Sequence, residues 1–321
     1  MTSAIRLSTI RPFLLLVALI ASAGFSEASR GELCDKSPLK EQSAFSRELL
    51  SAVEPGTAYS YGTGYKEAGI YGKDDRVEVE RRAYPFRTVG RLVTEWEILD
   101  DNGKVVKTSE FTCTATLVGN CHLLSARHCL VDQKDASSRD APKKRLKTAV
   151  FIDALGRRHS TSKTQTGKTT DFSDDYSFLK LSASPGKELG FVPFIKRSSG
   201  SHPTGSRFIA AGFSTDLNGG EFLTADMGAQ KVSKSPDPKI LTLKADTFAG
   251  ASGGPIFGLS DNGAPYVAAV HTMARMRRDP ETGKIVQLHY SDDEKERLSI
   301  SVATESFAAG LKSFIKNNPC P

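Results

Sequence analysis

The feature that most constrains the fold is a series of short apolar segments, separated by turn residues, that begins near Tyr84. Two of the separating sets, Asp101-Asn102-Gly103 and Asp261-Asn262-Gly263, favour tight hairpins between neighbouring strands. The apolar segments cover residues 91–99, 111–118, 149–152, 176–181, 208–213, 240–244 and 266–271. This pattern predicts an all-β protein.

A helix is predicted only near the C-terminus. Phe307, Leu311 and Phe314 recur at helical spacing, so they would form one apolar face. Thr304 stands where an N-terminal cap belongs, and Pro319 follows the expected end.

The N-terminus predicts export from the cytoplasm. Arg6 and Arg11 precede an apolar run at residues 13–20, and small residues follow, so residues 1–28 are interpreted as a signal peptide. The run is short for a membrane span, although an uncleaved N-terminal anchor is the alternative. Residues 29–69 lack a sustained period and are predicted to be a propeptide or N-terminal extension, which leaves residues 70–321 for the folded domain.

Composition weighs against two classes of partner. The 321 residues carry a formal net charge of +6, and basic residues gather at 139–147 and 275–278. No nucleic-acid-binding motif accompanies these runs, and no later stretch is apolar enough to cross a bilayer. We therefore interpret them as solvated loops and expect neither a nucleic acid nor a membrane as partner.

Three motifs contain residues suited to nucleophilic acyl transfer. His128 lies in Ser-Ala-Arg-His-Cys, Asp175 begins Asp-Tyr-Ser-Phe-Leu, and Ser252 lies in Gly-Ala-Ser-Gly-Gly-Pro. A serine hydroxyl is a weak nucleophile unless a base takes its proton, and an acid must orient that base. The motifs predict Ser252 as nucleophile, His128 as base and Asp175 as the orienting acid; Asp174 is the alternative acid.

These motifs, in this order, resemble the chymotrypsin-like (trypsin-fold) serine peptidases, and more closely their secreted glutamyl-endopeptidase branch. The likeness extends upstream to residues 72–77 and 84–92 and ends near residue 316, although only the triad motifs are specific. It implies a trypsin-like double barrel, with two six-stranded antiparallel β-barrels, the active site between them and a C-terminal helix on the second. Residues 70–321 would then form a trypsin-like serine protease domain.

The resemblance also implies roles for the residues around the triad. The backbone N–H groups of Gly250 and Ser252 would form an oxyanion hole, which binds the negative oxygen of a tetrahedral intermediate. Arg127 departs from the small residue usual in the family. Ala251 replaces the aspartate with which digestive relatives capture a newly cut N-terminus, so activation through that ion pair is excluded.

Five cysteines in an exported chain suggest disulfides. The resemblance pairs Cys113 with Cys129, and at most one further bridge can form among Cys34, Cys121 and Cys320. The spacings lack the short cysteine pair of structural zinc sites, so no metal is expected.

Two interpretations of the substrate pocket remain open. Asp246 lies six residues before Ser252, where the resemblance to trypsin would place an acid that selects Lys or Arg. In the glutamyl branch, a histidine at His271 and hydroxyls such as those of Thr247 and Thr272 would bind a glutamate carboxylate. Alternatively, Asp246 caps a loop and His271 only packs; the upstream likeness favours the acidic specificity.

The sequence thus predicts a secreted (extracellular or periplasmic) serine endopeptidase, made as a zymogen. It would act as a monomer on protein or peptide substrates through an acyl-enzyme, without a cofactor. A catalytically silent relative that binds a partner through the same cleft is the alternative from another class. An active protease specific for Lys or Arg is a second alternative, and a binder of nucleic acid or membrane through the basic loops a third.

Overall fold

The computed structural model describes residues 53–58, 70, 74–132, 143–202, 204–231, 237–278, 285–287 and 298–321, with the backbone alone for 53–58, 274–278 and 285–287. The predicted signal peptide and most of the predicted propeptide, with Cys34, lie outside the described residues. Within the described part, no helix has the length and apolar character needed to cross a membrane.

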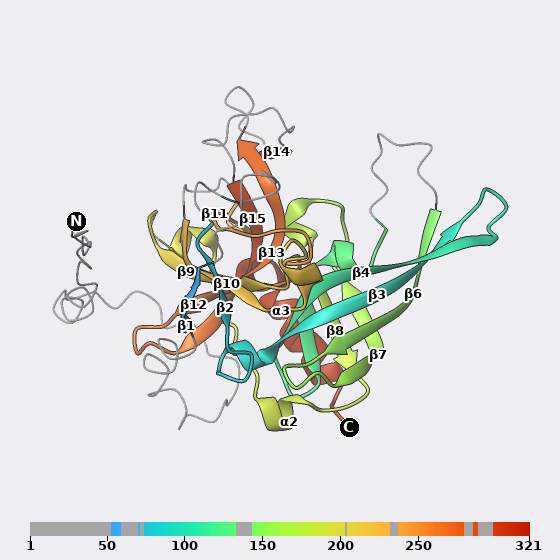
Figure 1. Ribbon diagram of the computed structural model, residues 1–321, viewed down its shortest axis with the longest axis horizontal. Coiled ribbons are helices and arrows are strands. Elements are labelled where there is room, and N and C mark those ends of the chain that lie inside the picture. Colours follow the sequence, from blue (N-terminus) through green and yellow to red (C-terminus); the bar gives the residue numbers. More distant parts are fainter. Residues whose placement is uncertain are drawn as a thin grey trace, which may run out of the picture. The chain divides into compact units, whose positions relative to one another are not determined.

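The first half of the domain is a closed barrel of six antiparallel strands (Figure 1). In barrel order they are β3 (Val89–Leu99), β4 (Val105–Leu117), β5 (His122–Ser125), β8 (Ser177–Leu181), β7 (Arg158–Thr166) and β6 (Lys143–Ile152). The barrel interior is filled by fully buried side chains, among them Leu92, Leu123 and Phe151. The predicted turn at residues 101–103 joins β3 to β4, and its Gly103 has a φ of +79°.

The second half is another six-stranded barrel, which closes where β9 pairs with β10. Its strands are β9 (Arg207–Gly212), β10 (Thr224–Lys231), β11 (Ile240–Lys244), β15 (Leu298–Ala303), β13 (Pro265–Arg278) and β12 (Pro255–Leu259). Three further strands extend this sheet: β2 (Arg76–Val79) pairs with β10, β1 (Val53–Ala58) with β2, and β14 (Ile285–Gln287) with β13. The predicted double barrel with a C-terminal helix is confirmed.

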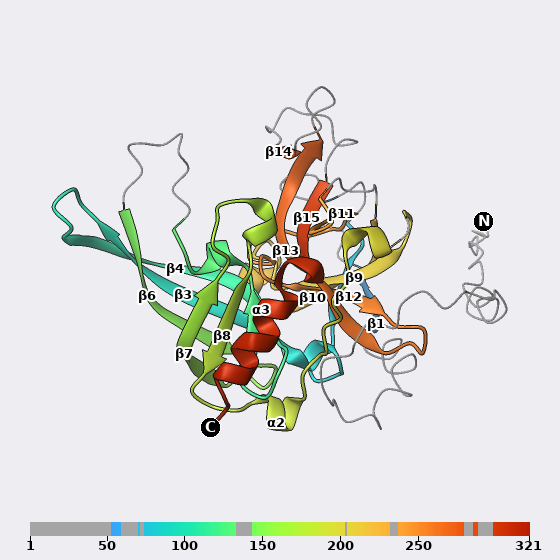
Figure 2. The ribbon, with the colours of Figure 1, turned by 180° about the vertical axis from the view of Figure 1, so that it is seen from behind.

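The predicted helix is α3 (Thr304–Asn317), which begins directly after β15. Figure 2 shows it running from the end of β15 towards β7 and β8 of the first barrel. Its buried Phe307 and Phe314 both contact the ring of Phe178 in β8, so the helix packs on the first barrel as well as the second. The predicted cap is wrong: Thr304 is the first helical residue, and its hydroxyl donates to the backbone carbonyl of Ile195 at 2.5 Å.

The remaining helical segments are short. They are α2 (Gly186–Leu189) and the 3-10 turns η3 (Phe86–Thr88), η4 (Arg127–Cys129), η5 (Phe172–Asp174), η6 (Ser199–Ser201) and η7 (Asn218–Gly220).

Two disulfides connect segments of the domain. The predicted bridge between Cys113 of β4 and Cys129 of η4 is present, and we call it the histidine bridge because it fixes the turn that contains His128. The terminal bridge joins Cys121, next to β5, to Cys320 beyond α3.

Candidate active site

His128 and Asp175 meet because they lie on the connections to two paired strands. Ser125 at the end of β5 pairs with Ser177 at the start of β8. His128 follows Ser125 closely and Asp175 closely precedes Ser177, so both lie at the same end of this strand pair. The Nδ1 atom of His128 is 2.8 Å from Oδ2 of Asp175, and the backbone N–H of His128 donates to Oδ1 at 2.9 Å. Both carboxylate oxygens therefore hold one histidine.

The environment of this pair keeps the carboxylate ionised. Asp175 is 2% exposed, and burial alone would raise its pKa. The hydrogen bond and the charge of His128 outweigh burial, so the pKa of Asp175 lies below its usual value. The alternative acid, Asp174, is not at this position: its carboxylate accepts hydrogen bonds from the backbone and hydroxyl of Thr169.

Ser252 lies on the loop between β11 and β12, and this loop forms hydrogen bonds with both barrels. From the first barrel, the Thr114 backbone N–H donates to the Ser252 carbonyl at 2.8 Å, and the Thr114 hydroxyl donates to the Gly250 carbonyl at 2.8 Å. From the second barrel, His271 exchanges backbone hydrogen bonds of 2.8 Å with Gly253 and Gly254. Ser252 is thus held at the junction of β4 and β13.

The hydroxyl of Ser252 has not formed a bond with His128 in this structure. It donates to the Thr272 carbonyl at 3.4 Å, while the Ser252 carbonyl lies 3.8 Å from the sulfur of Cys129, the neighbour of His128. Catalytic hydrogen bonds are often long or unformed without substrate, and a rotation of the serine side chain changes them.

Two glycines of the Ser252 loop have a positive φ. Gly250 has a φ of +94° and Gly253 a φ of +83°, which other residues rarely adopt. A Cβ at Gly253 would lie 2.2 Å from the Ser125 hydroxyl oxygen, and one at Gly250 would lie 2.3 Å from the Phe213 carbonyl oxygen. Within the described part of the chain, neither the Gly250 nor the Ser252 backbone N–H donates a hydrogen bond.

The predicted pocket residues are all buried but differ in their bonds. His271 Nδ1 and Thr247 Oγ1 find no hydrogen-bond partner among the described residues, and neither does the hydroxyl of Ser301, which pairs with His271 across β13 and β15. Thr272 instead donates its hydroxyl to the Ile300 carbonyl at 3.1 Å. Sequence reasoning missed Ser301, because strand pairing alone brings it opposite His271.

Burial lowers the pKa of His271 to about 4, and the nearby charge of His128 acts in the same direction. His271 is therefore neutral at pH 7. Asp246 is 4% exposed, accepts a hydrogen bond from the Asp75 backbone N–H at 2.9 Å, and donates its own backbone N–H to Asp226. Its carboxylate is thus engaged by the segment that precedes β2.

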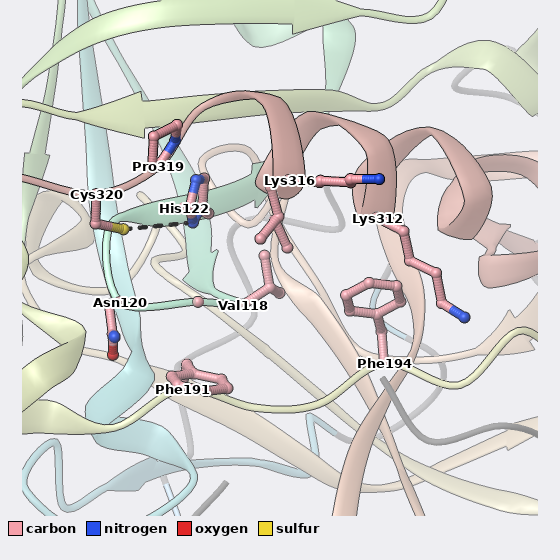
Figure 3. Close-up of a pocket in the computed structure, with 11 residues that line it drawn as sticks. Val118, Asn120, His122, Phe191, Phe194, Lys312, Lys316, Pro319 and Cys320 are labelled. Atoms are coloured by element: carbon pink, nitrogen blue, oxygen red, sulfur yellow. Dashed lines mark hydrogen bonds between the residues drawn. The ribbon is translucent and has the colours of Figure 1, made fainter. Parts of the chain in front are cut away.

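A separate cavity of about 490 Å³ lies beside the C-terminal end of α3 (Figure 3). Phe191, Phe194, Lys312 and Lys316 line it, together with His122, whose Nδ1 lies 3.6 Å from the sulfur of Cys320. None of the predicted site residues lines this cavity.

Two groups of described residues have the composition of a metal site: Cys113, His128 and Cys129, and Cys121, His122 and Cys320. In each group the two cysteines are joined to one another as a disulfide. Metals bind thiolates, which these sulfurs are not, so each group offers one imidazole and does not fit a zinc site.

Residues 113–264 match the trypsin-like peptidase domain family. This stretch contains all three predicted triad residues. The solved structure of a Glu endopeptidase has a similar fold, with a TM-score of 0.52 and 16% identity over 78% of this chain and 100% of that one. A thermostable serine protease from an extremophilic microorganism matches with a TM-score of 0.48 and 16% identity over 73% of this chain and 98% of that one.

One curated relative also matches. It is a Bacillus subtilis protein named extracellular metalloprotease, which is 25% identical over 210 residues. The match covers 64% of this chain and 62% of the relative, so less than two thirds of that protein is represented. The match of residues 113–264 to the trypsin-like peptidase domain family supports a serine endopeptidase, and the Glu endopeptidase structure supports the fold.

Proposed function

We propose that the chain is a serine endopeptidase in which Ser252, His128 and Asp175 form the catalytic triad. The observation that carries the proposal is the 2.8 Å contact between His128 Nδ1 and a buried, ionised Asp175. A carboxylate at Nδ1 leaves Nε2 of the neutral imidazole free to accept a proton. The proposal requires a proton donor at Nε2, and Ser252 lies nearby, because its carbonyl oxygen is 3.8 Å from the sulfur of Cys129, the residue that follows His128.

The reaction follows from these groups. Ser252 Oγ forms a bond to the carbonyl carbon of the substrate while its proton passes to His128, and the carbonyl oxygen becomes negative. The N–H groups of Gly250 and Ser252 stabilise that oxygen. The C–N bond then breaks as His128 protonates the leaving amine, and a water activated by His128 releases the acyl group and restores Ser252.

The proposed substrates are proteins or peptides cleaved after an acidic residue. His271 Nδ1 and Thr247 Oγ1 are buried polar atoms without hydrogen-bond partners among the described residues, and such atoms are costly unless a ligand satisfies them. A glutamate side chain would supply that partner. The competing Lys or Arg specificity would depend on the Asp246 carboxylate, one oxygen of which already accepts the Asp75 N–H.

Export is part of the proposal. Two disulfides are typical of proteins in oxidising compartments, which agrees with secretion through the predicted signal peptide at residues 1–28. The predicted propeptide at residues 29–69 would make the secreted chain a zymogen.

Labelling with a fluorophosphonate probe tests the triad. We expect the mature protein to be labelled and Ser252→Ala to be unlabelled yet folded, with exposed Ser182→Ala as the control that retains labelling. A folded wild type that binds a partner but neither labels nor hydrolyses peptides would establish the catalytically silent alternative.

Cleavage of matched peptides with Glu, Lys or Phe before the scissile bond tests the specificity. We expect preference for Glu that is lost in His271→Ala. Preference for Lys or Arg that disappears in Asp246→Ser would overturn it.

A further inference from the structure

The peptide bond that precedes Gly250 is held by a single residue of a neighbouring loop. The carbonyl oxygen of Ala249 accepts two hydrogen bonds from Thr215, one from the backbone N–H at 2.7 Å and one from the hydroxyl at 2.9 Å. Thr215 follows β9 and Ala249 follows β11, so this contact crosses between two loops of the second barrel. Ala249 itself is exposed, so burial does not fix its position.

This contact determines the direction of the Gly250 N–H. In a trans peptide the carbonyl and the N–H point in opposite directions. Because the Ala249 carbonyl accepts hydrogen bonds from Thr215, the Gly250 N–H points away from the Thr215 donors. It has no acceptor in the part of the chain that the structure describes.

The same loop also limits where Gly250 can lie. A Cβ on Gly250 would be 2.3 Å from the Phe213 carbonyl oxygen and 2.8 Å from the methyl carbon of Thr215. Gly250 therefore packs directly on residues 213–215, and its φ of +94° is compatible with this close approach because it has no side chain.

The two donors of Thr215 select one of two peptide orientations. If the plane between Ala249 and Gly250 were reversed, the Gly250 N–H would face Thr215 instead of the carbonyl. The Thr215 hydroxyl can accept a hydrogen bond, but its backbone N–H can only donate and would lose its partner. The observed orientation satisfies both donors.

We propose that Thr215 is a positioning residue for the oxyanion hole: by binding the Ala249 carbonyl, it directs the Gly250 N–H towards the substrate carbonyl oxygen. This inference rests on the proposed function. Nothing in the local sequence marks Thr215, since it acts on a loop 34 residues away through backbone atoms.

The test compares Thr215→Val, which removes the hydroxyl and keeps the shape, with Thr215→Ser, which keeps both donors. Thr161→Val is the matched control, because the Thr161 hydroxyl also donates to an alanine carbonyl, that of Ala149 at 3.1 Å, in the first barrel. Rates are expressed per active site titrated by prolonged fluorophosphonate labelling, so loss of folded protein does not enter them.

Two inhibitors separate positioning from general damage. A peptide aldehyde forms a hemiacetal with Ser252, whose oxygen occupies the oxyanion hole, whereas the corresponding peptide alcohol fills the same subsites without that oxygen. We expect Thr215→Val to lower kcat about two- to tenfold, the range for loss of one neutral hydrogen bond, with KM unchanged. Affinity for the aldehyde should fall by the same factor and affinity for the alcohol should not change.

Thr215→Ser and Thr161→Val should both behave as the wild type. A wild-type kcat in Thr215→Val, or an equal loss of aldehyde and alcohol affinity, would overturn the positioning role while leaving the triad intact. Failure of the proposed function is a different result: the wild type itself would show no labelling that depends on Ser252.

Discussion

The hydroxyl of Thr114 forms hydrogen bonds to two loops of the second barrel, and it can be removed with little change of shape. It donates to the Gly250 carbonyl at 2.8 Å and accepts the Phe213 backbone N–H at 3.0 Å, and the residue is fully buried. Thr114→Val leaves both backbone groups buried without a partner. Each such group costs about 1–3 kcal/mol, so the free energy of unfolding should fall by about 2–6 kcal/mol. That is a large share of the roughly 5–15 kcal/mol of a typical domain.

Urea unfolding measures this loss as a lower midpoint at an unchanged slope. Thr116→Val is the matched control on the same strand: Thr116 is 1% exposed, but its hydroxyl has no partner among the described residues. Removing that hydroxyl should leave the midpoint unchanged or raise it. Thr114→Ser, which keeps the hydroxyl and loses a methyl group, should cost only about 1 kcal/mol. If Thr114→Val proved no less stable than Thr116→Val, the hydroxyl would not be holding the Ser252 loop.

Three further outcomes are expected. Asp175→Asn should lower kcat about 10⁴-fold, because the imidazole loses its orienting acid, while Asp174→Asn should leave the rate unchanged. Burial lowers the pKa of His271, and of the buried His202 that follows η6, to about 4. Between about pH 6.5 and 4 the unfolded chain therefore binds more protons than the folded one, so the free energy of unfolding should decrease as the pH is lowered through this range. The decrease should be smaller in His202→Gln. The terminal bridge closes a separation of 199 residues and the histidine bridge one of 16. Replacing the terminal bridge by alanines should therefore lower the free energy of unfolding more, by about 5 kcal/mol against about 3 kcal/mol for the histidine bridge. Replacing the histidine bridge should lower the activity more.

Most of the fold was open to prediction because its signals are local. Apolar segments and turn signals placed β3, β4, β6, β8, β9, β11 and β13, and the spacing of Phe307, Leu311 and Phe314 placed the helix. The other strands, such as the mostly exposed β7, carried no apolar signal that was recognised. The predicted cap failed for a tertiary reason: residues 195–197 run past the start of the helix, and their backbone takes the Thr304 hydroxyl. The Thr304 hydroxyl bonds to residues distant in sequence instead of capping the helix.

In the candidate site, too, local motifs could be recognised in the sequence, whereas contacts between distant segments could not. The choice of Asp175 over Asp174 followed from the motif, and the structure brings Asp175 to His128. The pairing of Cys121 with Cys320, the position of Ser301 opposite His271, and the contact of Thr215 with Ala249 all join segments far apart in the chain. No local spacing encodes such contacts, so they appear only when the barrels are assembled.

Gly103 and Gly253 have similar backbone conformations, but they are glycines for different structural reasons. Gly103 and Gly253 have φ values of +79° and +83°, so in both places the chain needs a residue that tolerates a left-handed conformation. Around Gly103 nothing lies within 4 Å of the position of a Cβ, and a local hairpin turn accounts for it. At Gly253 a Cβ would lie 2.3 Å from the Thr114 carbonyl oxygen, an atom of the other barrel. The glycine after Ser252 is therefore required by the contact of one barrel with the other, and Ser252 keeps its place only while both barrels are folded and in contact.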